Sequence, residues 1–316
     1  MDDDDEEEEE EDVDAPFPTL RYKAVRQLGS GSFASVWLAR DKSQDYREVA
    51  IKVVNKKAEH PTEAGAVAAN VERARREAAL LQTLDHPNVV SIFDEFETDD
   101  VYCLVLEYAD AGDLFDWVSK QHGETTKTGP EFERIARDIF GQLLSALLHL
   151  HAQGILHRDI KLENVLLEHA PTTEHRPSGL RVLLADFGLA IVHTPRGDQP
   201  LMAGSDEYAA PEAILQSAIY DRCKTDVWSL GVVLYALLYG RLPFLRKANQ
   251  TRRSFLYRVA QGDVSFPQGV DTSKAAAEIV RALLRRKPGD RLSLSEIRHM
   301  PWIQEYMSAM DLTHRD

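Results

Sequence analysis

Residues 157–164 read His-Arg-Asp-Ile-Lys-Leu-Glu-Asn, which brings acidic, basic and amide side chains together in one short stretch. Before it, from Phe132 to Gly154, apolar residues recur every three or four positions, which predicts one buried face of a helix that ends at the glycine. After it, residues 165–167 are all apolar and predict a short buried strand. A charged loop held between two rigid elements is a typical place for a functional site, although a solvated charged turn is the alternative.

The length and the cysteine content predict a globular chain with two lobes. Its 316 residues, 43% of them hydrophobic, exceed the length of about 250–300 residues at which a single core stops growing. Cys103 and Cys223 are isolated from each other and from any Cys or His pair, so neither a disulfide framework nor a zinc site is predicted. This cysteine usage indicates a reducing compartment, and we expect the protein in the cytoplasm, the nucleus or both.

The formal net charge of −15 comes mostly from the first residues of the chain. Residues 2–12 are all Asp or Glu and Asp14 adds one more, so removing these 12 acids from 52 leaves 40 against 37 bases. Because such a segment repels itself, residues 1–19 are predicted to form a disordered acidic tail. A solvated tail and a docking segment for a basic partner both remain open.

The sequence shows no feature of a membrane protein. The acids that follow Met1 do not suit a cleavable signal peptide. The longest apolar run, residues 232–239, is far shorter than the roughly 20 residues of a membrane-spanning helix. We therefore expect a soluble protein without a membrane partner.

The stretch at 157–164 resembles the catalytic loop of eukaryotic protein kinases, H-R-D-x-K-x-x-N, with the lysine of the serine/threonine branch. The resemblance extends over residues 22–303, and its style is closest to the calcium/calmodulin-dependent-kinase-like group. It implies an α+β, two-lobed protein kinase fold with a small antiparallel-sheet lobe and a larger helical lobe. The implied boundaries are 20–107 for the small lobe, 107–113 for the hinge, 114–306 for the helical lobe and 307–316 for a C-terminal tail.

A glycine-containing stretch lies between two strand-like segments near the N-terminus. Residues 28–36 read Leu-Gly-Ser-Gly-Ser-Phe-Ala-Ser-Val. A hairpin argues against a dinucleotide site, in which a helix follows the glycines. The stretch resembles the kinase loop that covers the ATP phosphates, although Ala34 replaces its third glycine. The resemblance assigns ATP contacts to Leu28, Gly29, Gly31, Ser32, Phe33 and Val36.

Residues 49–52, Val-Ala-Ile-Lys, match the V-A-I-K strand of the family, in which Ala50 and Lys52 contact ATP. Further along, Glu77 shares a helical face with Leu81 and Leu84. A carboxylate on a buried face needs a cation, and Lys52 is the natural partner. The resulting ion pair is the one that an active kinase requires.

The region before this helix is predicted to be irregular. Residues 57–71 are polar and alanine-rich with one proline and one glycine, and we expect a lengthened loop. The basic residues Arg73, Arg75 and Arg76 have no interleaved aromatic residues. They predict a solvated helix face, and no nucleic-acid partner is expected.

Two strands are predicted at 89–96 and 101–108, and the second leads into residues 109–113. The resemblance makes this the hinge, where backbone groups of Glu107 and Ala109 meet adenine and the Asp113 side chain reaches the ribose. Further nucleotide contacts are implied for Glu163, Asn164, Leu166 and Asp186.

Residues 186–188, Asp-Phe-Gly, correspond to the kinase D-F-G motif, and Asp186 and Asn164 are the implied Mg²⁺ ligands. Asp159 is the implied base for the acceptor hydroxyl, and Lys161 offsets charge on the transferred phosphoryl group. Ser205 stands where a threonine normally bridges these two side chains.

The segment from Leu189 to Ala210 is predicted to be a loop that closes with the Ala-Pro-Glu motif at 210–212. Leu201 stands where many such kinases carry an activating phosphothreonine, and Thr194 is the only hydroxyl residue between Gly188 and Gly204. We therefore predict that activity does not need phosphorylation here, with Asp198 or another acid filling part of that role.

Several residues of the helical lobe are expected to be structural. Asp226 opens a helix that is apolar on nearly all faces, and its side chain is predicted to accept backbone donors from the catalytic loop. Arg291 is predicted to pair with Glu212. Satisfied core or cap roles are predicted for His149, His151 and His157. Residues 168–179 are predicted to form an exposed insertion. Helices are predicted at residues 251–261, 273–286 and 295–307.

Taken together, these motifs predict ATP- and Mg²⁺-dependent phosphorylation of serine or threonine in protein substrates. Asp113 and Glu163 occupy positions that meet arginines in relatives that prefer basic peptides. A pseudokinase scaffold and a small-molecule phosphotransferase are the alternatives. The pseudokinase is disfavoured because all five polar residues of the catalytic set are present, namely Lys52, Glu77, Asp159, Asn164 and Asp186. The small-molecule phosphotransferase is disfavoured because such enzymes usually lack the Ala-Pro-Glu segment. Leu162 stands where proline is usual.

Overall fold

The computed structural model describes residues 16–17, 20–31, 34–58, 60–123, 127–170, 178–193, 203–216 and 221–306. The chain divides into two compact units, a smaller one made of Met1–Thr83 with Ser91–Tyr108 and a larger one made of Leu84–Val90 with Ala109–Asp316. Residues 84–90, expected in the small lobe, therefore belong to the larger unit. Val90 donates its N–H to the carbonyl of Leu184, and Leu184 donates to Asn88, at 3.0 and 2.9 Å.

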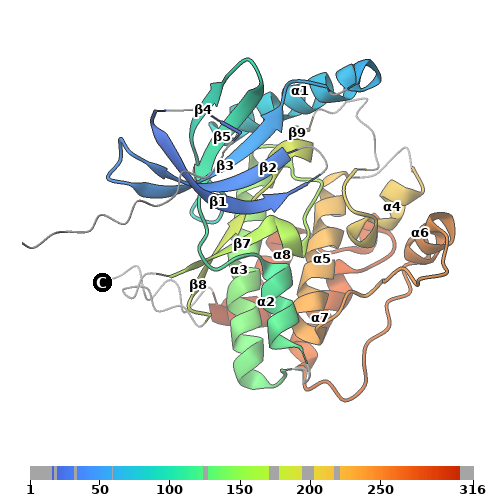
Figure 1. Ribbon diagram of the computed structural model, residues 1–316. Helices are drawn as coiled ribbons and strands as arrows, with labels where there is room; N and C mark the ends of the chain where they lie inside the picture. The colour runs from blue at the N-terminus through green and yellow to red at the C-terminus, as the bar shows by residue number, and fades with distance from the viewer. Residues whose placement is uncertain are drawn as a thin grey trace, which may run out of the picture. The chain divides into compact units, whose positions relative to one another are not determined.

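The smaller unit is built on a five-stranded antiparallel sheet (Figure 1). Its strands lie in the order β1-β2-β3-β5-β4. The central strands β3 and β5 are almost entirely buried because they are runs of apolar residues with neighbours on both sides. The strand bounds are β1 (Tyr22–Ser30), β2 (Ala34–Asp41), β3 (Arg47–Asn55), β4 (Ile92–Glu97) and β5 (Val101–Glu107).

Each face of this sheet is covered by its own apolar cluster. One face packs against Ala74 and Ala78 of helix α1 (Ala64–Leu81). The other face holds Phe17, which is only 2% exposed and lies edge-on to Trp37 at 6.4 Å between ring centroids. The core of the smaller unit thus includes a residue that the sequence analysis assigned to the acidic tail.

The prediction of a loop over residues 57–71 is wrong from Pro61 onward, whereas the described residues before Pro61 are irregular as predicted. A short 3₁₀ turn, η1 (Pro61–Glu63), leads directly into α1, which begins at Ala64. Alanine is the residue with the highest helix propensity, and Gly65 costs little in the first turn, where backbone donors have no helical partner in any case. The predicted strand from Val89 is also too long, since β4 begins at Ile92.

The larger unit is mainly helical, as predicted, with α5 packed against α3 and α7 (Figure 1). Because α5 is apolar on almost every side, it lies in the middle of this unit. Two small antiparallel sheets, the β6/β9 pair and the β7/β8 hairpin, complete it. The helices are α2 (Leu114–Gln121), α3 (Pro130–Ala152), α4 (Pro211–Ile214), α5 (Cys223–Tyr239), α6 (Arg252–Gln261), α7 (Lys274–Leu283) and α8 (Leu294–Arg298), and the strands are β6 (Ile155–Leu156), β7 (Val165–His169), β8 (Leu180–Leu184) and β9 (Ile191–Val192).

Two helix predictions near the C-terminus need correction. Helix α7 ends at Leu283 rather than at residue 286. The predicted helix at 295–307 is broken, because α8 ends at Arg298 and a second helical run begins at Pro301. Proline has no N–H to continue a helix and disfavours a helical conformation in the residue before it. In the described part of the chain, no helix combines the length and the apolar character that crossing a membrane requires.

Candidate active site

An ion pair joins Lys52 to Glu77 in the smaller unit. The Lys52 Nζ lies 3.0 and 2.8 Å from the two carboxylate oxygens of Glu77. Strand β3 holds the lysine and α1 holds the acid, whose side chain is 2% exposed beside the buried Leu81. Leu84 lies beyond the end of this helix. The structure therefore brings together the two residues that were predicted to pair, and the cation compensates an otherwise buried charge.

The glycine-containing stretch forms the turn between β1 and β2. Gly31 donates its N–H to the carbonyl of Ala34 at 2.8 Å, while Ser32 and Phe33 lie outside the described residues. A Cβ added at Gly29 would meet no atom within 4 Å. Packing within the described structure therefore does not explain a glycine at position 29, whereas close approach of a ligand to the backbone would. The flanking Leu28 and Val36 are partly buried.

The residues predicted to form the hinge are already engaged in local contacts. Glu107 donates its N–H to the carbonyl of Ser91 at 2.9 Å. The Asp113 side chain caps α2 by accepting the N–H of Asp116 at 2.8 Å. Asp113, predicted to reach the ribose, therefore also has a capping role, which an aspartate directly before a helix signals.

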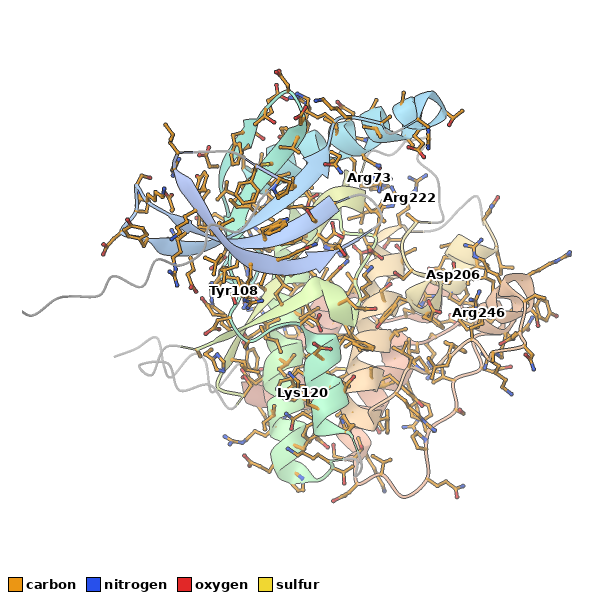
Figure 2. The ribbon with its side chains drawn as sticks, viewed as in Figure 1. Arg73, Tyr108, Lys120, Asp206, Arg222 and Arg246 are labelled. Carbon is orange, nitrogen blue, oxygen red and sulfur yellow. The ribbon has the colours of Figure 1, made fainter. Side chains whose placement is uncertain are left out.

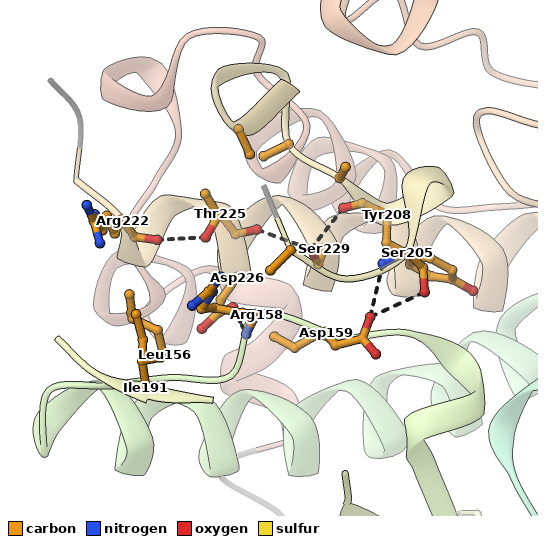
Figure 3. A pocket seen from close by; sticks show the side chains of 15 residues that line it. Leu156, Arg158, Asp159, Ile191, Ser205, Tyr208, Arg222, Thr225, Asp226 and Ser229 are labelled. Carbon is orange, nitrogen blue, oxygen red and sulfur yellow. Dashed lines mark hydrogen bonds between the residues drawn. The ribbon is translucent and has the colours of Figure 1, made fainter. Parts of the chain in front are cut away.

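Three polar side chains of the larger unit converge on the carboxylate of Asp159, and Figure 3 shows the contacts made by one of them, Ser205. Its Oδ1 accepts the N–H and the hydroxyl of Ser205 at 3.1 and 3.3 Å. Its Oδ2 lies 3.0 Å from Lys161 Nζ and 3.1 Å from Asn164 Nδ2. Lys161 also donates to the Ser205 hydroxyl at 3.3 Å. The predicted bridge through Ser205 is therefore present, around a carboxylate that is 8% exposed.

Asp226 holds the backbone of the catalytic loop in place from the first turn of α5. Its Oδ2 accepts the N–H of His157 at 3.0 Å and its Oδ1 accepts that of Arg158 at 2.9 Å, while His151 Nε2 lies 2.9 Å from Oδ2. Arg158 has a φ of 69°, a strained conformation for a residue with a side chain. Burial opposes ionisation of Asp226, but the bond from His151 and the backbone donors outweigh it and lower the pKa of the carboxyl.

His157 is a core residue, as predicted. It is fully buried, with Nε2 3.0 Å from the carbonyl of Ala185 and its ring edge-on to Phe187 at 4.8 Å. Burial lowers its pKa, so the imidazole is neutral at pH 7. His149 is also engaged, through Gln153 at 2.7 Å.

The two predicted metal ligands flank one end of the β7/β8 hairpin. Val165 pairs with Leu184, so Asn164 just before β7 and Asp186 just after β8 lie at the same end. Asn164 donates its amide N–H groups to the backbone carbonyl and to Oδ2 of Asp159, at 2.8 and 3.1 Å, which directs its amide oxygen elsewhere. Asp186 is exposed and has a φ of 59°.

This donor set suits a hard cation that takes further ligands from a nucleotide. In the described ranges, no group of three or more His, Cys, Asp or Glu side chains lies close enough to hold a metal ion on its own. An amide oxygen and a carboxylate fit Mg²⁺, which keeps several waters and binds substrate phosphates.

A 3₁₀ turn, η4 (Asp206–Tyr208), is fixed to the catalytic loop and to α5. The Tyr208 hydroxyl accepts the N–H of Leu162 at 3.4 Å and donates to Glu163 at 3.5 Å. Burial raises the pKa of Tyr208, so the phenol stays protonated. Ser229 donates to the Tyr208 carbonyl at 2.9 Å. Sequence reasoning missed these contacts because they join segments more than twenty positions apart.

The sequence matches the protein kinase domain family over residues 22–303, nearly all of the described chain. The chain belongs to the protein kinase family. The predicted resemblance and fold are therefore confirmed. Members of this family transfer phosphoryl groups from ATP with the help of a divalent metal.

Several curated serine/threonine kinases resemble this kinase domain. The probable serine/threonine-protein kinase KCC4 of Saccharomyces cerevisiae is 34% identical, with 92% of this chain and 26% of the relative covered. The serine/threonine-protein kinase SIK1 of Mus musculus is 35% identical, with 90% and 32% covered. The sucrose non-fermenting protein kinase 1 of Fusarium virguliforme is 36% identical, with 89% and 36% covered. The chain thus spans about a quarter to a third of the length of these relatives, which belong to the predicted kinase group.

The kinase domain also contains the predicted ion pair between Glu212 and Arg291. The guanidinium donates to both carboxylate oxygens at 2.6 and 2.7 Å, and the two side chains are 3% and 0% exposed. Arg291 donates further to the backbone carbonyls of Lys224, Arg285 and Arg286. The pair therefore ties the Ala-Pro-Glu motif to the start of α5 and to the chain after α7.

The segment before this motif is described only in part. A short strand, β9, lies where a loop was predicted and pairs with β6. Thr194, Asp198 and Leu201 lie outside the described residues. A pocket beside Asp159 is lined by Arg158, Arg222 and Thr225 among others (Figure 3).

Proposed function

We propose that this protein is a serine/threonine protein kinase that uses ATP with Mg²⁺. The observation that carries the proposal is the convergence of Lys161, Asn164 and Ser205 on the Asp159 carboxylate. Both carboxylate oxygens of Asp159 are held by neighbouring side chains, and the Lys161 Nζ lies 3.0 Å from one of them. A carboxylate held in this way can accept a proton from an alcohol, while the lysine can stabilise negative charge that develops nearby.

In the proposed mechanism, Asp159 orients the acceptor hydroxyl and takes its proton. Lys161 offsets charge on the phosphoryl group, and electrostatic stabilisation of this kind carries most of the catalysis in phosphoryl transfer. Ser205 holds Asp159 and Lys161 in register through its hydroxyl. An aliphatic alcohol is the proposed acceptor because Lys161 and Ser205 are typical of the serine/threonine branch.

Nucleotide contacts are proposed for residues of each unit, taken by itself. In the smaller unit, Lys52, oriented by Glu77, binds phosphate oxygens, and the backbone at Gly29 and Gly31 covers them. In the larger unit, Asn164 and Asp186 would hold Mg²⁺, which would supply positive charge to offset that of the nucleotide phosphates.

A pseudokinase scaffold is not supported. Such proteins lose polar groups of the catalytic set, whereas this chain keeps Lys52, Glu77, Asp159, Asn164 and Asp186. The serine/threonine-kinase relatives argue in the same direction. A small-molecule phosphotransferase is disfavoured by the segment that ends at the Ala-Pro-Glu motif.

The finer features of the function are also proposals. Glu163 is exposed and lies at the edge of the catalytic loop, and together with Asp113 it would attract arginines that precede the acceptor. The protein acts in the cytoplasm, the nucleus or both, on protein substrates rather than on nucleic acid or membranes. A basic partner for residues 2–12 is supported by their charge alone.

The function can be tested with radiolabelled ATP and a serine peptide that carries arginines before the acceptor. Label is expected in the peptide with Mg²⁺ and no transfer above background with excess EDTA, because the nucleotide phosphates need the cation that Asn164 and Asp186 are proposed to hold. Replacing the arginines by glutamine should lower kcat/KM about tenfold if both carboxylates bind them. Absence of transfer under all these conditions would overturn the proposal, and equal use of both peptides would remove only the basic preference.

Activity is expected to survive phosphatase treatment. Thr194 is the only hydroxyl residue between Gly188 and Gly204, and Leu201 occupies the position of the usual phosphothreonine. Because Arg158 is also held through its backbone by Asp226, the catalytic loop has a support that needs no phosphate. Protein treated with phosphatase and then freed of it should keep at least about half of its kcat. Complete loss of activity would contradict this prediction.

A further inference from the structure

A group of cations on and just before α6 takes no part in the site described above. Together with two large apolar side chains that are unusually exposed, Leu245 at 54% and Tyr257 at 68%, they form a surface that we name the α6 basic face. Its cations are Arg246, Lys247, Arg252 and Arg253, all of them exposed. Of these, only Arg252 makes an ion pair with an acid in the described part of the chain.

The α6 basic face is held in a defined conformation. Arg258, on α6, donates to the carbonyl of Leu245 at 2.5 Å and to the Gln250 side chain at 3.3 Å, which fixes the preceding loop to the helix. Thr251 caps the helix by accepting the N–H of Ser254 at 3.2 Å. Arg253 and Tyr257 are four positions apart and therefore lie on the same side of α6.

One ion pair connects this face to η4, the turn that lies next to Ser205. Arg252 donates to both carboxylate oxygens of Asp206 at 2.6 and 2.8 Å. Asp206 directly follows Ser205, whose N–H and hydroxyl contact Asp159. Figure 2 labels Asp206 and Arg246 in this part of the larger unit. The cations are thus tied, by a short series of contacts, to the segment beside the carboxylate that meets the acceptor.

We propose that the α6 basic face binds acidic side chains of the protein substrate that flank the acceptor serine or threonine. The inference rests on the proposed function and names a second element of its specificity. Cations that have no acidic partner among the described residues attract carboxylates, and the exposed Tyr257 offers apolar contact beside them. Residues 2–12 of this chain are a competing acidic occupant. The substrate is favoured because the bridge from Arg252 through Asp206 leads to the acceptor site.

The test compares three serine peptides that share the same arginines. One carries three glutamates before the acceptor, one carries three after it, and the third has glutamine at all of these positions. We expect one of the glutamate peptides to show a kcat/KM about 5–20-fold above that of the glutamine peptide in 50 mM salt. The ratio should fall below about threefold in 0.5 M salt, because exposed charges are screened.

Variants test whether the preference for the glutamate peptide comes from the α6 basic face. In the double variant Arg246→Glu/Arg253→Glu the ratio between the glutamate and glutamine peptides should fall to about 1 or below. The matched control Lys120→Glu/Arg298→Glu changes net charge equally through exposed cations on α2 and α8. It should keep the full ratio. Equal melting temperatures would show that all the variants are folded.

Three results would overturn the inference. The wild-type protein could use all three peptides equally well, or the preference could persist in the double variant of the face. The third result concerns replacement of residues 2–12 by Asn and Gln. If this replacement raises activity on every peptide when the α6 basic face is intact, but not when the face carries the double substitution, the acidic segment is the occupant of the face. If no peptide is phosphorylated, the proposed function itself fails. Phosphorylation of the glutamine peptide without any acidic preference removes only this inference.

Discussion

Replacing Asp159 by asparagine is expected to lower kcat by about 10²–10⁴-fold, the usual contribution of a positioned general base. The amide has nearly the same shape as the carboxylate but cannot accept the proton of the acceptor hydroxyl. The contacts with Ser205 and Asn164 orient the side chain in the protein, so the loss should appear in kcat rather than in the KM for ATP. The measurement is the steady-state rate of phosphorylation of a serine peptide.

Glu207 provides the matched control for this prediction. It is a partly buried acid on η4, two positions from Ser205, and it is assigned no part in the mechanism. Glu207→Gln should keep kcat within about threefold of the wild-type value, because surface substitutions of this kind remove no reacting group. A protein with Asp159→Asn that stays folded and retains more than a tenth of the wild-type kcat would show that Asp159 is not the base.

Replacing Arg291 by methionine is expected to reduce the free energy of unfolding by about 3–5 kcal/mol. The substitution leaves the Glu212 carboxylate buried without its cation and removes donors from three backbone carbonyls. Chemical denaturation monitored by tryptophan fluorescence measures the change, and Trp228 is a suitable reporter because Arg291 lies 4.9 Å above its ring.

Two further variants separate the buried pair from ion pairs in general. Adding Glu212→Leu to Arg291→Met should recover part of the lost stability, because the uncompensated charge is then gone. Arg134→Met breaks an exposed pair with Glu131 at 2.8 Å and should leave the melting temperature unchanged. A loss below about 1 kcal/mol for Arg291→Met would contradict a stabilising role for the pair.

The parts of the fold that were predicted correctly have strong local patterns. The period of three to four apolar residues before Gly154 predicted α3, and the apolar residues after Asn164 predicted β7. The prediction of a loop at 57–71 was wrong from Pro61 onward because the helix propensity of the alanines outweighs the single proline and glycine. The helix predicted at 295–307 failed because the boundary at Pro301 was overlooked.

Some contacts of the candidate site could be predicted from the sequence, and others could not. Pairing of Glu77 with Lys52 followed from a carboxylate on an apolar helix face, since a buried charge requires a partner. The bridge from Ser205 to Asp159 and Lys161 followed from the family motifs. The capping of α2 by Asp113 had a local signal that was not used, whereas no local signal indicated that Phe17 would enter the core or that Asp206 would pair with Arg252.

The sequence by itself determined the kinase fold, the catalytic groups and the segments that carry them. It could do so because these features depend on residue types at short, fixed spacings, where covalent geometry limits which side chains can act together. Only the tertiary structure decided that Arg252 contacts Asp206, 46 positions away, and that its neighbouring cations have no acidic partner among the described residues. Such contacts depend on how helices and loops pack, because packing brings together charges that no local pattern relates.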